Sequence, residues 1–245
     1  MLRVEKEIKT NCKIWSFLEL NGHRVVLTKA QLDSVKEVGF GGMLDIKISK
    51  YPPGILAYLV SNFDPYGWVQ WIKNGKSERE YYLTPADVHD IIGLPINQRN
   101  LIQTSFNNKD LVAKWRHFLG AGDDEELKTH MILDKFKDYP EGGDVFKQLF
   151  VLYAGSAILA PLPEHKIRYN LLPVVEVVSA IQTFDWCHYT LSVLASSIAR
   201  ILKPGSTHST VNGCAIILLV AYCYRVVFKG QRYPKSLPLI QNITD

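Results

Sequence analysis

Paired cysteines are missing from this sequence. It has four cysteines in 245 residues, and none of them belongs to a CxxC pair. Zinc sites of ordinary spacing take ligands from such pairs, so the sequence does not support a metal site. Three of the four lie in apolar stretches that we expect to be helical, where a free cysteine behaves as a small hydrophobic residue. We therefore expect reduced, intracellular thiols at Cys12, Cys187, Cys214 and Cys223.

A hydrophobic run long enough to cross a bilayer is also missing. The most apolar run, residues 214–224, is shorter than the roughly 20 residues that a membrane helix needs. The N-terminus, MLRVEKEIKT, is charged and has no apolar segment of the kind found in signal peptides. These features predict a soluble intracellular protein that does not contact a membrane.

The sequence has no large excess of either positive or negative charge. The sequence has 28 Lys and Arg against 24 Asp and Glu, which gives a net charge of +4. Domains dedicated to nucleic acid usually concentrate Lys and Arg on one face, whereas here they are scattered. The charge therefore permits weak association with nucleic acid without arguing for it, and a hydrophobic fraction of 47% excludes global disorder.

No stretch carries a recognisable catalytic apparatus. Cys187 and His188 look like a nucleophile and its base, but adjacent helical residues point about 100° apart and do not face each other. The acidic residues 123–126 suit the N-terminal end of a helix over 123–137 better than a cation loop, which spaces its oxygen ligands at alternate positions. We predict no catalytic residue, no metal site and no cofactor.

What the sequence does contain is a succession of amphipathic helices. The pattern predicts a mainly α, multi-helix globular domain with one or two small β-hairpins. Asn74-Gly75 predicts a hairpin between 68–72 and 80–83, and Asn21-Gly22 a second hairpin, although the arm before Asn21 suits a helix equally well. The expected helices span 28–38, 52–63, 84–93, 109–119, 123–137, 145–159, 172–184, 185–202 and 210–227. We expect Asn108 to cap the helix over 109–119 and Asp185 to cap the helix over 185–202.

Residues 38–95 organise the chain. Gly41 and Gly42 follow a helix capped by Thr28, and they lack the Lys-Ser/Thr of a phosphate-binding loop, so we interpret them as a helix stop and turn. Asp64 precedes a proline and is interpreted as a turn residue that bonds its own backbone. Thr84-Pro85-Ala86-Asp87 begins a capped helix that Gly93 ends.

The order FGG, NFDP, hairpin and LTPADVHDIIGLP resembles the plant mobile domain, a module of plant transposable elements and of host genes derived from them. The similarity covers residues 38–228 and implies that the residues matching its motifs are family-signature positions with a structural role. They are Phe40, Gly41, Gly42, Phe63, Asp64, Pro65, Val88, His89, Gly93, Leu94, Pro95, Trp186, Cys187, Gly213 and Cys214.

The resemblance also suggests a division of the chain. Residues 1–37 form a variable leader with the first helix, and residues 38–228 form the domain that is similar to the plant mobile domain. The break Tyr139-Pro140-Glu141-Gly142-Gly143 marks a subdivision near 139–143. Residues 229–245 form an extended C-terminal tail.

The function that the resemblance implies is a non-enzymatic, transposon-derived protein-interaction domain in the nucleus, linked to transposon silencing or genome maintenance. We expect a protein partner and no small-molecule substrate. The family has been labelled aminotransferase-like, but a Schiff-base lysine, an acidic partner and a phosphate cup cannot be assembled here. In related proteins a SUMO-type cysteine protease domain follows, and only a longer gene model would add one.

The alternative is a nucleic-acid-binding accessory module of a transposable element. This interpretation requires a contiguous basic surface and affinity that falls steeply with salt. The residues proposed to contact nucleic acid are Lys166, Arg168, Arg232 and Lys235.

Overall fold

The fold is described by a computed structural model, which places residues 7–12, 19–20, 23–48, 51–52, 54–74, 77–101, 108–226, 234 and 236–243. The mainly α class is confirmed, with ten α-helices in the described part of the chain. They are α1 Lys29–Glu37, α2 Ile55–Ser61, α3 Pro85–Ile92, α4 Lys109–Leu119, α5 Thr129–Phe136, α6 Gly143–Ala154, α7 Leu172–Val175, α8 Val178–Ile181, α9 Trp186–Leu202 and α10 Ile216–Arg225.

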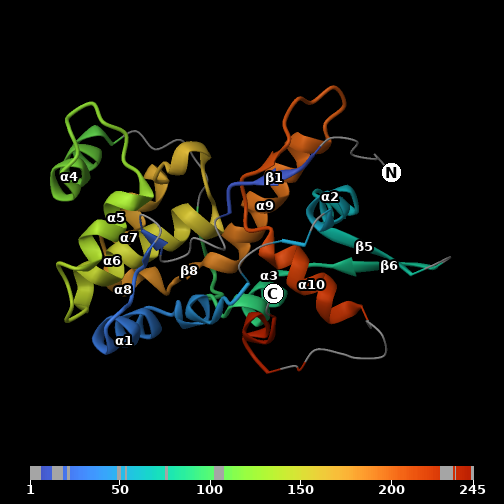
Figure 1. The fold of residues 1–245 in the computed structure, drawn as a ribbon, viewed down its shortest axis with the longest axis horizontal. Coiled ribbons are helices and arrows are strands. Elements are labelled where there is room, and N and C mark those ends of the chain that lie inside the picture. Colours follow the sequence, from blue (N-terminus) through green and yellow to red (C-terminus); the bar gives the residue numbers. More distant parts are fainter. Residues whose placement is uncertain are drawn as a thin grey trace.

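The strands are short except for one hairpin. Figure 1 shows α1 and α4–α6 at one end of the molecule, α9 and α10 through its middle, and β5 and β6 extending from the other end. The strands are β1 Lys9–Thr10, β2 Glu19–Leu20, β3 His23–Arg24, β4 Phe63–Asp64, β5 Val69–Asn74, β6 Ser77–Tyr82, β7 Arg99–Asn100, β8 Phe184–Asp185 and β9 Thr210–Val211.

Both predicted hairpins are present among the described residues. β5 and β6 pair antiparallel from Val69↔Tyr82 to Asn74↔Ser77, and β4 adds to β5 to give the order β4-β5-β6. β2 and β3 pair as the second hairpin, although residues 13–18 and 21–22 lie outside the described range. The parallel pairs β1–β9 and β7–β8 each join segments that are distant in the sequence, a feature that no local pattern predicted.

Four predicted N-caps are confirmed. Thr28 and Thr84 each form a capping box, in which the hydroxyl accepts from the backbone of the third helical residue, Gln31 or Asp87. Asn108 and Asp185 accept from Leu111 and His188 in the same way. These helix starts were readable because a cap is a local interaction between residues three apart.

The helix predicted over 123–137 begins too early, because α5 starts only at Thr129. The backbone N–H of Ile167 donates to the carbonyl of Leu127 at 2.8 Å, and Lys128 forms a β-bridge with Lys166. This pairing holds the residues before Thr129 out of the helix. A partner about forty positions away therefore overrides the favourable charge pattern of the acidic cluster.

Four further helices differ from prediction. The helix expected over 52–63 is α2, which ends at Ser61 because Phe63 pairs with Gln70 of β5 as part of β4. The helix expected over 210–227 starts at Ile216, because Thr210–Val211 pairs with β1. The helix expected over 172–184 is divided into α7 and α8 where Val177 adopts an extended conformation. The helix predicted over 145–159 is α6 followed by the π-helical turn η2, Gly155–Leu159.

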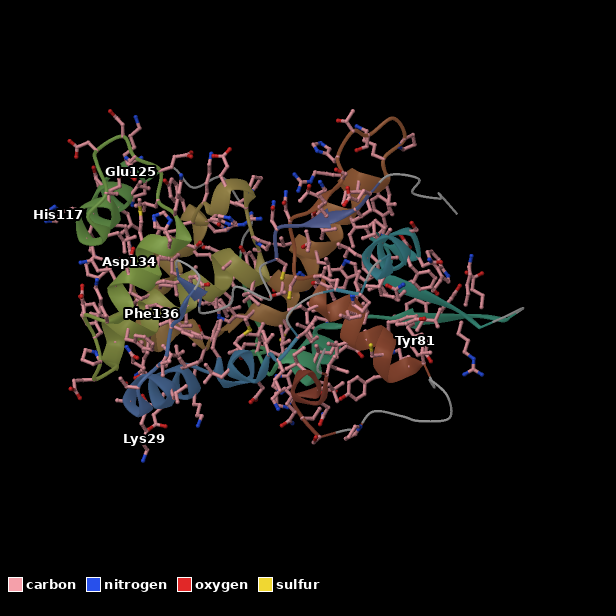
Figure 2. All side chains as sticks on the ribbon, in the orientation of Figure 1. Lys29, Tyr81, His117, Glu125, Asp134 and Phe136 are labelled. Atoms are coloured by element: carbon pink, nitrogen blue, oxygen red, sulfur yellow. The ribbon has the colours of Figure 1, made fainter. Side chains whose placement is uncertain are left out.

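One hydrophobic core runs through the described residues. It includes seven of the twelve residues of α6, and Phe136 of α5 lies 5.0 Å from Phe146, centroid to centroid. Phe136 and Tyr81 lie towards opposite ends of the molecule in Figure 2. The turn near 139–143 joins α5 to α6 within this core, and the domain division placed there stays a prediction.

Part of the predicted tail folds back onto the body. The 3₁₀ helix η5, Leu239–Asn242, packs on α3 and on the 3₁₀ helix η1, Gly41–Asp45, and its Ile240 is fully buried. Residues 227–233 and 235 are outside the described range. None of the helices in the described part of the chain is long and apolar enough to span a membrane.

Candidate functional site

The signature residues after α3 meet the start of α9. The Leu94 carbonyl oxygen lies 2.6 Å from His89 Nδ1 and accepts from the Cys187 thiol at 3.4 Å. The Trp186 backbone N–H donates to the Pro95 carbonyl at 3.2 Å. These bonds join the His89…Pro95 motif to Trp186-Cys187, which lies about ninety residues away, and we call this junction the signature node.

Phe40 and Gly42 complete the signature node. Phe40 turns inward, with no exposed surface, and meets Trp186 edge to face at a centroid distance of 5.0 Å. Gly42 lies so close to α3 that a Cβ atom on it would be 2.2 Å from the Ile92 carbonyl oxygen. Gly42 is therefore needed for close backbone approach, and the Gly41-Gly42 turn lies against protein backbone.

Cys187 and His188 contact different neighbours. The Cys187 thiol is buried against Leu94, and burial, assisted by the charge of Asp185, raises its pKa from 9.0 to about 12. The His188 ring packs instead against Trp68 at 5.4 Å between centroids. A thiol with this pKa is protonated at neutral pH, so the geometry is that of a packing contact.

The remaining signature positions also make structural contacts. The Asp64 carboxylate accepts from the backbone N–H groups of Tyr66 and Gly67 at 3.0 and 3.1 Å, which confirms the turn interpretation. A Cβ on Gly213 would lie 2.5 Å from the Leu194 Cα atom, so Gly213, which precedes α10, packs closely against the backbone of α9. Val88, Phe63 and Cys214 are buried, and Pro65 follows β4 in the turn.

The four residues expected to contact nucleic acid do not form a described basic face. Lys166 is bound by Glu126 at 2.6 Å and by Glu164 at 3.4 Å, and this raises its pKa. Arg168 is half-buried and donates through Nε to the Ala160 carbonyl. Arg232 and Lys235 lie outside the described residues.

A surface pocket of about 290 Å³ lies where α1, α6 and α8 meet. Its lining includes Lys147, which pairs with Glu37 at 3.0 Å and with Asp144 at 3.4 Å. The hydrogen bond that Lys147 donates to the Glu37 carboxylate is the main cause of the raised pKa of Lys147. Because both neighbouring carboxylates already occupy the ammonium group, the pocket offers little unused charge to a ligand.

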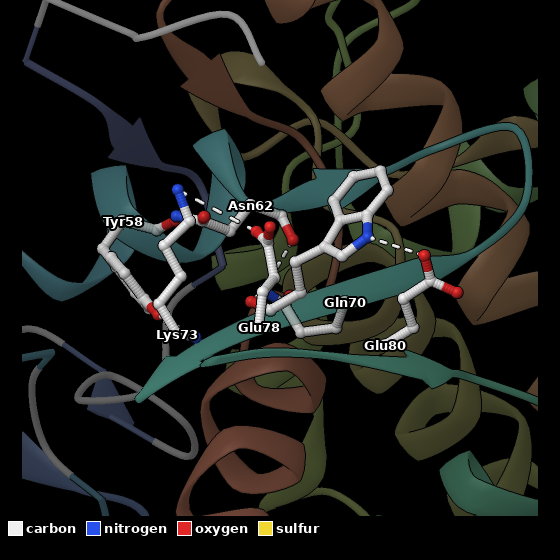
Figure 3. Close-up of polar contacts among 7 residues, drawn as sticks. Tyr58, Asn62, Gln70, Lys73, Glu78 and Glu80 are labelled. Carbon is white, nitrogen blue, oxygen red and sulfur yellow. Dashed lines mark hydrogen bonds and ion pairs between the residues drawn. The ribbon is translucent and has the colours of Figure 1, made fainter. Parts of the chain in front are cut away.

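The β5–β6 hairpin presents the candidate site. In the observed register Val69, Trp71 and Lys73 stand opposite Tyr82, Glu80 and Glu78 on one face of the hairpin. We call this set of six residues the outward face. Its centre is Glu80, whose carboxylate accepts from Trp71 Nε1 at 3.4 Å and from the Tyr82 hydroxyl at 3.2 Å, as Figure 3 shows for Trp71 and Glu80.

The charges on the outward face are unequally matched. Lys73 Nζ pairs with Glu78 at 3.9 Å, and this pair is drawn in Figure 3. Glu80 has no Lys, Arg or His within ion-pair distance in the part of the chain that the structure describes. Its two contacts are neutral donors, so its negative charge lies between two aromatic side chains with no compensating cation among the described residues. The Tyr82 side chain is 65% exposed.

Buried amides hold the outward face in place. Gln70 is 1% exposed and donates through Nε2 to the Asn62 carbonyl at 2.9 Å, and the Trp71 backbone N–H donates to the same carbonyl at 2.8 Å. Asn62 in turn donates to the Tyr58 carbonyl at 2.7 Å. These bonds, seen together in Figure 3, tie the hairpin to the end of α2 and fix the orientation of Trp71.

The residues of the outward face were not singled out from the sequence. Trp71, Glu80 and Tyr82 carry no motif, and their proximity depends on the register of the hairpin. A signal was present all the same: Asn74-Gly75 fixes the turn, and with the turn fixed the alternate residues of the two arms fall on one face.

The molecule is thus a mainly α-helical globular domain with one extended hairpin sheet. A family model described as a domain of unknown function (DUF8566) matches residues 10–219, most of the chain, and the chain belongs to this family. No curated protein and no solved structure gave a significant match. The family match carries no link to the plant mobile domain, so that resemblance stays a prediction.

Proposed function

We propose that this chain is a non-enzymatic protein-interaction domain that binds a lysine- or arginine-bearing segment of a partner protein on its outward face. The observation that carries the proposal is the Glu80 carboxylate, which lies between Trp71 and Tyr82 and has no cationic partner among the described residues. A carboxylate beside aromatic side chains is complementary to a cation, because both the carboxylate and the electron-rich face of an aromatic ring attract positive charge.

The exposure of this site limits its affinity. An exposed ion pair contributes about 0–1 kcal/mol, and a cation–π contact at an exposed site about 0.5–1 kcal/mol. One lysine or arginine would therefore bind weakly, and a segment with several basic residues is needed for micromolar binding. The expected partner segment is extended and basic, and lies along the hairpin.

The biological setting follows from the sequence resemblance alone. The order of the FGG, NFDP and LTPADVHDIIGLP motifs supports a transposon-derived protein that acts in the nucleus, in transposon silencing or genome maintenance. A fluorescent fusion of the intact chain in plant cells tests the location. Exclusion from the nucleus would remove this setting and leave the binding proposal unaffected.

Fluorescence anisotropy with a labelled Lys/Arg-rich peptide tests the binding proposal. We expect Glu80→Gln, which keeps the size of the side chain and removes its charge, to weaken binding by about three- to tenfold at low salt. The matched control is Glu141→Gln, the same change at an exposed position on the turn between α5 and α6. A glutamate-rich peptide of equal length is the control ligand.

Two results would overturn this proposal. One is equal affinity for the basic and the acidic peptide, and the other is equal loss in Glu80→Gln and Glu141→Gln. The nucleic-acid alternative is tested in the same assay with a labelled oligonucleotide. Oligonucleotide binding that falls steeply with salt and is insensitive to Glu80→Gln would favour the accessory-module function.

A further inference from the structure

We propose that the basic partner segment binds by adding a strand to the outer edge of β6, antiparallel to it. Strand addition rests on the proposed function, and it adds the binding mode, the direction of the segment and the spacing of its basic residues. The observation that carries it is the position of β6 at the end of the sheet order β4-β5-β6, with no strand of the described residues on its other side.

The register of the hairpin shows which backbone groups of β6 point away from β5. The Leu83 N–H donates to the Trp68 carbonyl at 2.8 Å, which continues the ladder of β5 and β6 by one pair. Because hydrogen-bonded and non-hydrogen-bonded pairs alternate in an antiparallel ladder, Tyr81 and Arg79 also bond to β5. The N–H and C=O groups of the alternate residues therefore point to the outer edge, where no described backbone group bonds to them.

These alternate residues are the ones that β6 contributes to the outward face. They are Glu78, Glu80 and Tyr82, and all three are exposed. A residue paired with Glu80 across the outer edge has its side chain on the same face, because directly opposite residues in a sheet share a face. A lysine or arginine there would lie beside the carboxylate that has no cationic partner among the described residues. Backbone hydrogen bonds would supply affinity, and the side chains opposite the two glutamates would supply specificity.

The other face of β6 is held by helices. The Arg225 guanidinium of α10 lies 4.8 Å from the centre of the Tyr81 ring and pairs with Asp87 of α3 at 2.7 Å. Tyr81 is half-buried, whereas its neighbours Glu80 and Tyr82 are exposed. A strand that is already fixed in this way loses little conformational freedom when a segment pairs with it, so ordering costs little of the binding free energy.

The charges of β6 favour a basic segment over a second copy of this chain. Because opposite residues share a face, two antiparallel β6 strands would pair about a residue and not between two residues. The longest such pairings are centred on Arg79 or on Glu80, and they place Glu78 opposite Glu80 or the two Glu80 residues opposite each other. Like charges directly opposite are destabilising, whereas Lys or Arg opposite Glu is stabilising. Charged side chains on an edge strand also protect it from pairing with itself.

The direction of pairing defines the order of side chains in the segment. Antiparallel pairing is slightly more stable per residue than parallel pairing. Read from its N-terminus, the segment should place an apolar residue opposite Tyr82, a basic residue opposite Glu80 and a second basic residue opposite Glu78. Because Lys73 already pairs with Glu78 at 3.9 Å, the residue opposite Glu80 should contribute most of the charge recognition. The probe is a labelled peptide with valine, lysine and lysine at alternate positions and threonine between them.

N-methyl groups on the peptide backbone test strand addition by fluorescence anisotropy, with the protein unchanged. Methylating the N–H of the lysine opposite Glu80 removes a hydrogen bond to β6, and we expect affinity to fall about three- to tenfold. The matched control is N-methylation of a neighbouring threonine, whose N–H points away from β6, and this should change affinity less than about twofold. A peptide of the same composition with its lysines adjacent should also bind more weakly, because only alternate residues share a face.

Amide exchange of the isotope-labelled chain, followed by nuclear magnetic resonance, gives a second readout. At a peptide concentration about 100 times Kd, exchange of the Glu80 and Tyr82 N–H groups should slow by up to about a hundredfold. The Arg79 and Tyr81 N–H groups already bond to β5 and should change much less.

Strand addition and the proposed function can fail separately. Equal effects of N-methylation at lysine and threonine, or peptide binding without slower exchange at Glu80 and Tyr82, would overturn strand addition. If Glu80→Gln still weakens that binding, the proposed function stands, whereas the absence of any Glu80-dependent binding overturns both. Protection at Glu80 that rises with protein concentration in the absence of peptide would show that a second copy occupies the edge, which also overturns the proposal.

Discussion

The signature node and the outward face use similar side chains in opposite ways. In the node, Phe40 and Trp186 are fully buried and meet edge to face. On the outward face, Trp71 and Tyr82 hold a carboxylate at the surface of a hairpin that extends from the body. Aromatic rings pack in the core at the node. On the outward face, aromatic side chains flank the Glu80 carboxylate, which has no cationic partner among the described residues.

This difference separates what marks the fold from what the surface can bind. Every described contact of the node is with another part of the same chain, including the Leu94 carbonyl and the Ile92 backbone. The motif residues there are explained by packing. The charge that has no cationic partner among the described residues is that of Glu80, which belongs to no motif. A search for chemistry confined to the motifs would miss it.

The largest expected effect comes from removing a ring of the node. Phe40→Ala should lower the free energy of unfolding by about 4 kcal/mol, since it opens a cavity in a packed core. Tyr82→Ala on the outward face should change it by less than about 1 kcal/mol, because the ring is largely exposed. Urea unfolding followed by circular dichroism measures both, and similar losses would mean that the two regions are not distinct in stability.

A smaller effect is expected from adding one methyl group. Gly42→Ala places a Cβ against the Ile92 backbone and should cost about 1–3 kcal/mol. Gly41→Ala is the matched control, because its Cβ would meet the flexible Lys36 side chain at 3.2 Å. If both variants unfold at the same urea concentration, close approach at Gly42 does not hold the node together.

An effect that is absent at neutral pH is expected from raising the pH. The Cys187 thiol has a pKa near 12 in the folded protein against an ordinary value of 9.0, so the unfolded chain loses this proton first. Stability should therefore fall between about pH 9 and 12, by at most about 1.4 kcal/mol per pH unit for this one group.

Cys187→Ala should flatten the slope of stability against pH over this range, measured by urea unfolding at successive pH values. Labelling with iodoacetamide at pH 8 should leave Cys187 unmodified until the chain unfolds, because its thiolate fraction is only about one in ten thousand. Rapid labelling of Cys187 in the folded protein would contradict the packing described for the node.

The sequence correctly predicted the local interactions of the fold. The caps at Thr28, Thr84, Asn108 and Asp185 were predicted because each is made between neighbours in the sequence. The helix starts that were predicted wrongly depend on partners far away in the sequence. Leu127 is hydrogen-bonded to the backbone of Ile167, and Thr210–Val211 pairs with β1. Propensity alone cannot anticipate a strand partner that the chain supplies far away.

For the charged residues too, the sequence predicted only part of what the structure shows. Arg168 was noticed as a basic residue, but only the folded structure shows that it has no carboxylate within ion-pair distance among the described residues and that its Nε donates to the Ala160 carbonyl. Lys166 and Arg168 look alike in the sequence, yet Glu126 neutralises Lys166 alone. Which charges remain uncompensated is a property of the folded surface.

The sequence by itself determined the mainly α class, the β5–β6 hairpin and the helix caps, because periodicity, Asn74-Gly75 and capping residues act over a few positions. Tertiary structure alone decided that Gly42 touches Ile92, that Leu94 meets Cys187 and that Glu80 lies between two aromatic side chains. Apart from the Tyr82–Glu80 contact within one strand, these contacts join residues between 9 and 93 positions apart. They form only once core packing and strand register have fixed where each segment lies.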